Sequence, residues 1–282
     1  MGVRITMHRT GILYALASAA LFGISAPLAK ILLGQASPWL LAGLLYLGSG
    51  IGLALARPFL PRDEAKLKRR DLPWLGAAIL SGGVIGPVLL MFGLAQGAAG
   101  ATSLLLNLES VLTLALAWIV FRENVDSRLL VGAAAIVAGA VILSWPAEST
   151  GAGLSSTLLV AGACLAWAID NNLTRKVSGA DPVAIAMLKG LIAGAVNTAI
   201  ALGSGATFPP LGAVALAGLL GFFSYGISLT LFVLALRHLG TARTGAYWAG
   251  APFIGAAVAI LFLREPLTLP FIAGGLRTAL GL

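Results

Sequence analysis

The chain has 282 residues, of which 59% are hydrophobic and only 10% are charged, and its mean hydropathy is +0.98. Soluble domains are far less apolar, so this composition excludes an ordinary globular protein and indicates a polytopic membrane protein. The formal net charge of +8 does not indicate nucleic-acid binding, because the basic residues lie between apolar segments and form no basic domain.

Ten apolar segments are each expected to cross the bilayer as a helix, since about 20 helical residues span the ~30 Å hydrocarbon core. The first of them is too long for the core of a cleavable signal peptide and is expected to remain as a membrane helix. The fold class is therefore an all-α polytopic membrane protein with ten transmembrane helices. The expected spans are residues 10–33, 38–56, 72–95, 100–121, 128–146, 154–175, 182–203, 210–236, 241–263 and 267–282.

The basic residues predict the orientation of these spans. Placing the N-terminus in the cytoplasm puts fourteen of the 18 Lys and Arg residues on the cytoplasmic side, and only Lys30 and Arg264 on the far side. Cytoplasmic loops of membrane proteins carry such an excess of Lys and Arg. Both termini are therefore expected to be cytoplasmic.

Two sequence features recur at one offset of 142 residues, namely an Arg-Glu pair and two glycines that follow it. With five spans in each half, the second copy must enter the membrane from the opposite side, which makes an inverted repeat like those of many secondary transporters. We expect repeats at residues 1–146 and 154–282 within one integrated transmembrane domain, with a substrate site near the midplane. The recurring residues are Arg122-Glu123, Gly132 and Gly139 in the first half and Arg264-Glu265, Gly274 and Gly281 in the second. In the third and eighth spans, Gly86 and Phe92 are matched with Gly226 and Phe232.

The Arg-Glu pairs, the spaced glycines and Pro252 together resemble the EamA-type, ten-helix branch of the drug/metabolite transporter superfamily, and within it the bacterial amino-acid and metabolite exporters. The resemblance covers essentially the whole chain. It implies export of a small-molecule substrate across the bacterial inner membrane, by alternating access and with the lipid bilayer as partner. It specifies no substrate, because members handle amino acids, sugars, nucleotide-like metabolites and drugs. One departure is span ten, which is about five residues shorter than span five by the repeat offset, so a truncated or altered C-terminus is expected.

The fourth span carries a carboxylate, Glu109, near its midpoint. A turn of about 100° per residue places this group in one polar arc with Ser103 and Asn107. Such a helix either lines a water-filled substrate cavity, which makes these three residues substrate-binding, or holds Glu109 as a protonated carboxyl in a helix contact.

The sixth span carries a second polar cluster of Trp167, Asp170, Asn171 and Thr174. Trp167 could stack on an organic substrate while Asp170 or Asn171 binds its polar group. Alternatively, Asp170 pairs with a neighbouring cation and Trp167 marks the membrane interface. The sequence favours neither interpretation.

Lys189 lies two turns into the seventh span, where a lone ammonium costs at least ~2.5 kcal/mol. It is expected either to pair with Asp170 or Glu109, or to bind the carboxylate of a substrate. Tyr225 and Tyr247 complete the predicted substrate-binding set, since their aromatic rings with polar groups lie inside spans. A cavity with both anionic and cationic groups suits a zwitterion, which favours amino acids over sugars.

Three prolines, Pro27, Pro87 and Pro252, lie beside glycines in the middle of spans and are candidate hinges. Helix packing through the same glycines is the alternative interpretation.

The chain lacks HExxH, GxSxG and Gly-rich phosphate motifs, and Cys164 is its single cysteine. No cofactor, metal site or disulfide is therefore expected. Two rival functions remain: a membrane-embedded enzyme that acts on lipid-linked substrates with Glu109 and Asp170 as acid and base, and an exporter of drugs or sugar-like metabolites.

Overall fold

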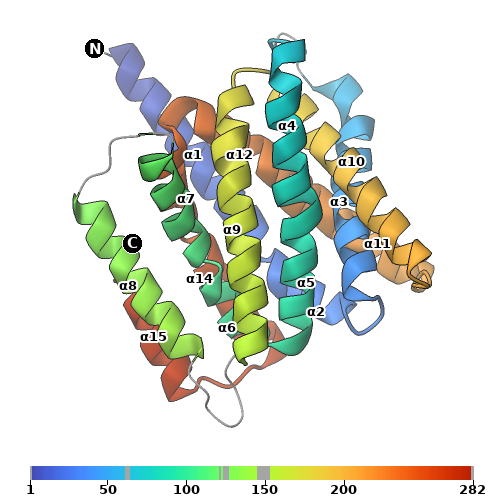
Figure 1. The fold of residues 1–282 in the computed structure, drawn as a ribbon, viewed down its shortest axis with the longest axis vertical. Coiled ribbons are helices and arrows are strands. Elements are labelled where there is room, and N and C mark those ends of the chain that lie inside the picture. The colour runs from blue at the N-terminus through green and yellow to red at the C-terminus, as the bar shows by residue number, and fades with distance from the viewer. Residues whose placement is uncertain (1, 61–63, 121, 123–126, 145–152, 281–282) are drawn as a thin grey trace.

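The computed structural model describes residues 2–60, 64–120, 122, 127–144 and 153–280, and all regular structure within these ranges is helical (Figure 1). Glu123 and Gly281 of the repeated motif lie outside them. Eight helical stretches are long and apolar enough to cross a membrane, and a shorter apolar helix covers Leu130–Leu143. The eight are Arg9–Leu32, Pro38–Phe59, Arg69–Gln96, Ala99–Ile119, Leu154–Val177, Pro182–Gly203, Leu211–Leu239 and Arg243–Leu263. The expectation of an all-α polytopic membrane protein is confirmed.

Most spans consist of more than one helical element. In the first half these are α1 (Gly2–Gly23), α2 (Ser25–Leu32), α3 (Pro38–Ala56), η1 (Arg57–Phe59), η2 (Arg69–Asp71), α4 (Leu72–Ala78), η3 (Ile79–Ile85), α5 (Gly86–Gln96), α6 (Ala99–Leu105), α7 (Leu108–Ile119) and α8 (Ser127–Ser144). In the second half they are α9 (Leu154–Val177), α10 (Pro182–Gly203), α11 (Leu211–Leu220), η4 (Gly221–Ile227), α12 (Ser228–Leu239), α13 (Thr241–Trp248), α14 (Ala251–Leu263) and α15 (Leu269–Ala279).

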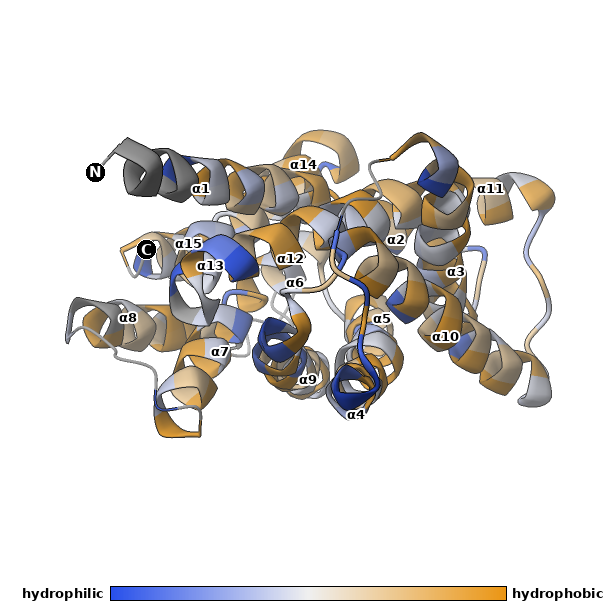
Figure 2. Cartoon of the chain, turned by 90° about the horizontal axis from the view of Figure 1, so that it is seen from above, coloured by the Kyte–Doolittle hydropathy of each residue, from blue (hydrophilic) through white to orange (hydrophobic). Residues whose placement is uncertain are grey.

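The two halves run through the bundle in opposite senses. Figure 1 shows α1 descending from the N-terminus, whereas α9, the first helix of the second half, ascends from its start at the bottom. Figure 2 shows hydrophobic residues along most helices and hydrophilic residues gathered at helix ends, such as the upper ends of α4 and α9. This distribution is the one expected of helices that cross a hydrocarbon layer.

Local backbone irregularities repeat at the same offset as the sequence motif. The π-helical segments η3 and η4 begin at Ile79 and Gly221, which are 142 positions apart. Arg122 and Arg264, also 142 apart, both adopt left-handed backbone angles, with φ of 55° and 54°. The structural offset corrects the matching of Gly86 with Gly226, which differs from it by two residues.

Helices α3 and α10 pack across the two halves through glycines. An added Cβ at Gly50 would lie 2.4 Å from the backbone nitrogen of Leu191, and one at Gly194 would lie 2.4 Å from that of Leu47. Backbones approach this closely only where side chains are absent, as in small-residue contacts of membrane helices. These glycines thus bring the two halves together.

Charged groups join the halves at both ends of the bundle. At the end where α9 meets α10, Arg57 pairs with Asp181, and Arg237 contacts Glu64 at 3.0 Å. At the opposite end, the Glu265 carboxylate accepts hydrogen bonds from the backbone N–H groups of Ala99 and Gly100, at 2.6 and 2.7 Å. A carboxylate is favourable at a helix N-terminus, so the second Arg-Glu motif caps α6 of the first half.

A candidate binding cavity between the two halves

A cavity with about 460 Å³ of empty space, part of it open, lies within the helix bundle. Both halves contribute to its wall, which combines aromatic rings, hydroxyls and two carboxyls. The lining residues are Ser18, Phe22, Tyr46 and Glu109 from the first half and Trp167, Asp170, Asn171, Ser224, Tyr225, Ser228, Leu229, Phe232 and Trp248 from the second.

Two interrupted helices supply lining residues at their breaks. Glu109 is the second residue of α7, just after the break between α6 and α7, and Trp248 is the last residue of α13, just before the break that precedes α14. The breaks occupy equivalent positions in the two halves. The position of Glu109 in the first turn of α7 puts its carboxyl near the positive end of the helix dipole.

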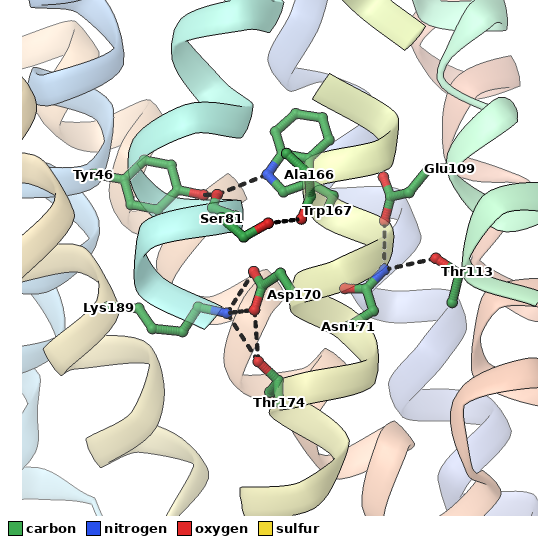
Figure 3. A network of polar contacts seen from close by, with 11 residues as sticks. Tyr46, Ser81, Glu109, Thr113, Ala166, Trp167, Asp170, Asn171, Thr174 and Lys189 are labelled. Carbon is green, nitrogen blue, oxygen red and sulfur yellow. Dashed lines mark hydrogen bonds and ion pairs between the residues drawn. The ribbon is translucent and has the colours of Figure 1, made fainter. Parts of the chain in front are cut away.

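Glu109 is buried, and only one of its two carboxyl oxygens has a hydrogen-bond partner among the described residues. Asn171 Nδ2 donates to Oε1 at 2.8 Å and also lies 3.3 Å from Thr113 Oγ1 (Figure 3). Oε2 receives no hydrogen bond from the described part of the chain. A buried polar atom without a partner is costly, so Oε2 is available to a ligand, as is the hydroxyl of Tyr225, which also lines the cavity without a hydrogen-bond partner in the described chain.

Asp170 is engaged on both oxygens. Lys189 Nζ lies 2.5 Å from Oδ1 and 2.7 Å from Oδ2, and Thr174 Oγ1 donates to Oδ1 at 2.7 Å (Figure 3). Lys189 also contacts Thr174 at 3.1 Å, and its side chain is only 1% exposed. The structure therefore pairs Lys189 with Asp170, one of the two partners expected from the sequence, and places the ammonium outside the cavity lining.

The π-helical segment η3 holds two side chains of the cavity wall, Tyr46 and Trp167, next to the Asp170–Lys189 pair. The carbonyl of Gly82 accepts hydrogen bonds from both Tyr46 Oη at 2.7 Å and Trp167 Nε1 at 2.8 Å (Figure 3). The wider turn of a π-helix shifts the backbone hydrogen-bond pattern, and side chains here bind the exposed carbonyl. An added Cβ at Gly82 would lie 1.9 Å from Asp170 Oδ2, so only glycine fits at this position.

Phe22 is the centre of an aromatic cluster on the cavity wall. Its ring centroid lies 4.7 Å from that of Trp248, 5.5 Å from Tyr225 and 5.9 Å from Trp167. These separations are typical of favourable aromatic pairs. The cluster joins α1 to three elements of the second half.

Three serines of the wall were missed by the sequence interpretation. Ser18 Oγ accepts a hydrogen bond from Trp248 Nε1 at 3.0 Å and lies 2.8 Å from the carbonyl oxygen of Ser228. Ser224 Oγ donates to the carbonyl of Leu21 at 2.7 Å. The spacing of Ser224 and Ser228 by one helical turn was a usable signal, because it marks a polar strip on an otherwise apolar span.

Five of the nine predicted substrate-binding residues line the cavity: Glu109, Trp167, Asp170, Asn171 and Tyr225. Four lie elsewhere, namely Ser103, Asn107, Lys189 and Tyr247.

The break between α6 and α7 explains two of these displacements. The polar arc assumed one continuous helix, but the helix is interrupted before Leu108. Ser103 instead packs near Gly255, and Asn107 donates to the carbonyl of Leu104 at 3.2 Å. Tyr247 is half-buried against a separate cluster of α1 and α12 residues.

The three candidate hinge prolines all lie at starts of helical elements. Pro27 is in the first turn of α2, Pro87 is the second residue of α5, and Pro252 is the second residue of α14. Interrupted helices at these positions agree with the sequence; bending at them stays a prediction.

The fold and the cavity define a polytopic α-helical membrane protein built from two related halves. The chain belongs to the EamA-like transporter family, which matches residues 9–145 and again residues 154–282. The resemblance noted in the sequence is thereby confirmed.

Two curated relatives are named as uncharacterized transporters. The chain is 30% identical over 266 residues to an uncharacterized transporter of Methanothermobacter thermautotrophicus, covering 88% of this chain and 78% of that protein. It is 26% identical over 270 residues to the uncharacterized transporter YvbV of Bacillus subtilis, covering 90% and 84%. A solved crystal structure matches with a TM-score of 0.73 over 96% of this chain and 94% of that chain, at 16% identity, which shows the fold alone.

Proposed function

We propose that this chain is a secondary transporter that exports small metabolites carrying an amino group, amino acids among them, across the bacterial inner membrane. The observation that supports the proposal is a cavity inside the bundle whose wall is shared by both halves of the chain. In transporters with inverted repeats, substrate binds between the repeats, and access alternates as one moves against the other. The moving halves are residues 1–146 and 154–282 within one transmembrane domain, and Pro27, Pro87 and Pro252 are the hinges.

The cavity offers an ionisable partner to the ammonium group of an amino acid and none to its carboxylate. The sequence argument for amino acids required an anionic and a cationic group in the cavity. Lys189 is committed to Asp170, so the ionisable group left for a ligand is the Glu109 carboxyl with its neighbour Asn171. These atoms suit an ammonium group, which donates hydrogen bonds and accepts none.

Transport without chemical change separates this proposal from the embedded-enzyme alternative. Purified protein in liposomes should give saturable passage of a small amine, recovered unchanged by mass spectrometry, and protein-free liposomes should give none. Recovery of a modified product alone would favour the enzyme, with Glu109 and Asp170 as its acid and base. Absence of saturable passage across a panel of amines and amino acids would refute transport.

We propose that both termini face the cytoplasm, supported by the Lys and Arg content of residues 57–71 and the other loops on that side. A reporter that is active only outside the cytoplasm should be silent when fused within residues 57–71 and active when fused at Gly205, in the turn after α10. The reverse pattern would overturn the orientation and the argument for inverted repeats that uses it.

A further inference from the structure

The cavity holds one carboxyl that pairs with no cation of the described chain. Asp170 and Lys189 neutralise each other, and no Lys, Arg or His occurs among the described residues that line the cavity. Glu109 Oε2 is buried and has no hydrogen-bond partner in the described chain. A positively charged donor that entered the cavity would meet an acceptor already stripped of water.

A second part of the cavity wall consists of aromatic rings. The rings of Phe22, Trp167, Tyr225 and Trp248 form one connected cluster, and Phe232 extends it with a centroid 5.4 Å from Trp248. Aromatic faces attract cations through their quadrupole and also cover the apolar body of a ligand. An ammonium group on an apolar carbon skeleton is complementary to both kinds of wall.

A substrate carboxylate finds no cation in the wall, and the one lining hydroxyl without a hydrogen-bond partner in the described chain is the neutral Tyr225 Oη. The hydroxyls of Ser18 and Ser228 hydrogen-bond to each other, and Ser224 binds the carbonyl of Leu21. The Lys189 ammonium already has three oxygen contacts from Asp170 and Thr174. A buried anion without a partner is strongly unfavourable, and the Glu109 carboxyl would add repulsion.

We propose that the cavity selects organic monocations, meaning an ammonium group on a small apolar or aromatic body, over zwitterions and anions with the same body. This selectivity rests on the proposed transport function, and it narrows the substrate class at the same site. Glu109 binds the ammonium group, Asn171 positions the Glu109 carboxyl, and the Phe22 cluster covers the apolar body.

Four probes that share one phenyl group test the charge preference directly. They are phenethylamine (cation), phenylalanine (zwitterion), 3-phenylpropionate (anion) and 2-phenylethanol (neutral). Binding to the full chain in lipid nanodiscs is measured by calorimetry at neutral pH, and passage by uptake into liposomes. We expect phenethylamine to bind at least about tenfold more tightly than phenylalanine, with 3-phenylpropionate weakest, because both acids bring a carboxylate that no cation of the wall balances.

Variants assign the preference to named residues. Glu109→Gln should weaken phenethylamine binding by about ten- to hundredfold, as expected for loss of a charged hydrogen-bond partner, and should hardly alter 2-phenylethanol binding. Glu64→Gln makes the same chemical change outside the cavity and should leave all affinities unchanged. Phe22→Leu keeps an apolar side chain and should weaken the amine by about 2- to 30-fold, more than it weakens the alcohol.

The outcomes separate the inference from the function on which it rests. If phenylalanine binds as tightly as phenethylamine and crosses saturably, the cation preference is wrong and transport stands. If phenethylamine binds best but no probe crosses, transport is wrong and the cation site stands. Failure of all four probes to bind, or an unchanged amine preference in Glu109→Gln, overturns the inference.

Discussion

Asp170 and Glu109 are two carboxyls of one cavity wall with nearly equal burial, 5% and 4% exposed, yet they have opposite surroundings. Asp170 receives hydrogen bonds from Lys189 and Thr174 on its two oxygens, whereas Glu109 has Asn171 alone on one oxygen. The two carboxyls therefore differ in the number of their hydrogen-bond partners and not in their burial. The comparison indicates that Asp170 maintains the structure and that Glu109 is available to a ligand.

The largest effect is expected from Asp170→Asn. The substitution leaves the Lys189 ammonium buried without a counter-ion and should reduce the free energy of unfolding by about 3–5 kcal/mol. Chemical denaturation in detergent micelles measures it. Adding Lys189→Met should restore most of the loss, because it removes the unpaired charge. If Asp170→Asn were as stable as the wild type, the structural role of Asp170, and with it the contrast to Glu109, would be wrong.

Gly82→Ala tests the same ion pair from the backbone side. The new methyl would meet Asp170 Oδ2 at 1.9 Å and should lower stability by about 1–3 kcal/mol through overpacking. Gly76→Ala in the same span is the matched control, since no atom lies within 4 Å of its added Cβ. Equal melting temperatures for the two variants would contradict the close contact.

Tyr46→Phe removes one of the two donors to the Gly82 carbonyl. Trp167 still satisfies that oxygen, so the loss should be about 1 kcal/mol, near the average for one hydrogen bond. Adding Trp167→Phe should destabilise by more than the sum of the two single changes, because the carbonyl then has neither donor. Strict additivity in this double-mutant cycle would argue against a shared acceptor.

Glu109→Gln should change stability least, by less than about 1 kcal/mol, because the amide oxygen can still accept from Asn171. Transport of an amine should nevertheless fall at least about tenfold, since the variant loses the group that ionises. Flux into liposomes and a melting curve on the same preparation give both values. A marked loss of stability with unchanged flux would assign Glu109 to the structure and reverse the comparison.

Sequence predicted ten apolar spans and their inversion, and the described structure shows eight helices long enough to cross a membrane and one shorter apolar helix. It also predicted that Lys189 needs an anion and left Asp170, Glu109 and a substrate carboxylate as candidates, of which the structure selects Asp170. Long apolar runs match the thickness of the bilayer, and a repeated motif indicates a duplication. A buried lysine requires an anion at the same depth in the membrane.

The break after Leu105 could not be predicted, since residues 105–110, LLNLES, contain neither proline nor glycine. That break removed Ser103 and Asn107 from the cavity. The role of Glu265 was also hidden, because its partners are backbone groups of α6 some 165 residues away.

The equal spacing of the two π-helical segments also records the history of the chain. The starts of η3 and η4, the two left-handed arginines and the starts of α8 and α15 are each 142 positions apart, and the starts of α7 and α14 differ from this by one residue. Before η3 and η4 the spacing varies, since α3 and α10 begin 144 positions apart and α4 and α11 begin 139 apart. The matched position of the widened turn supports its presence in a common ancestral half, and the larger differences in spacing lie upstream of it. One residue lost from either copy would rotate the helix that follows by about 100°.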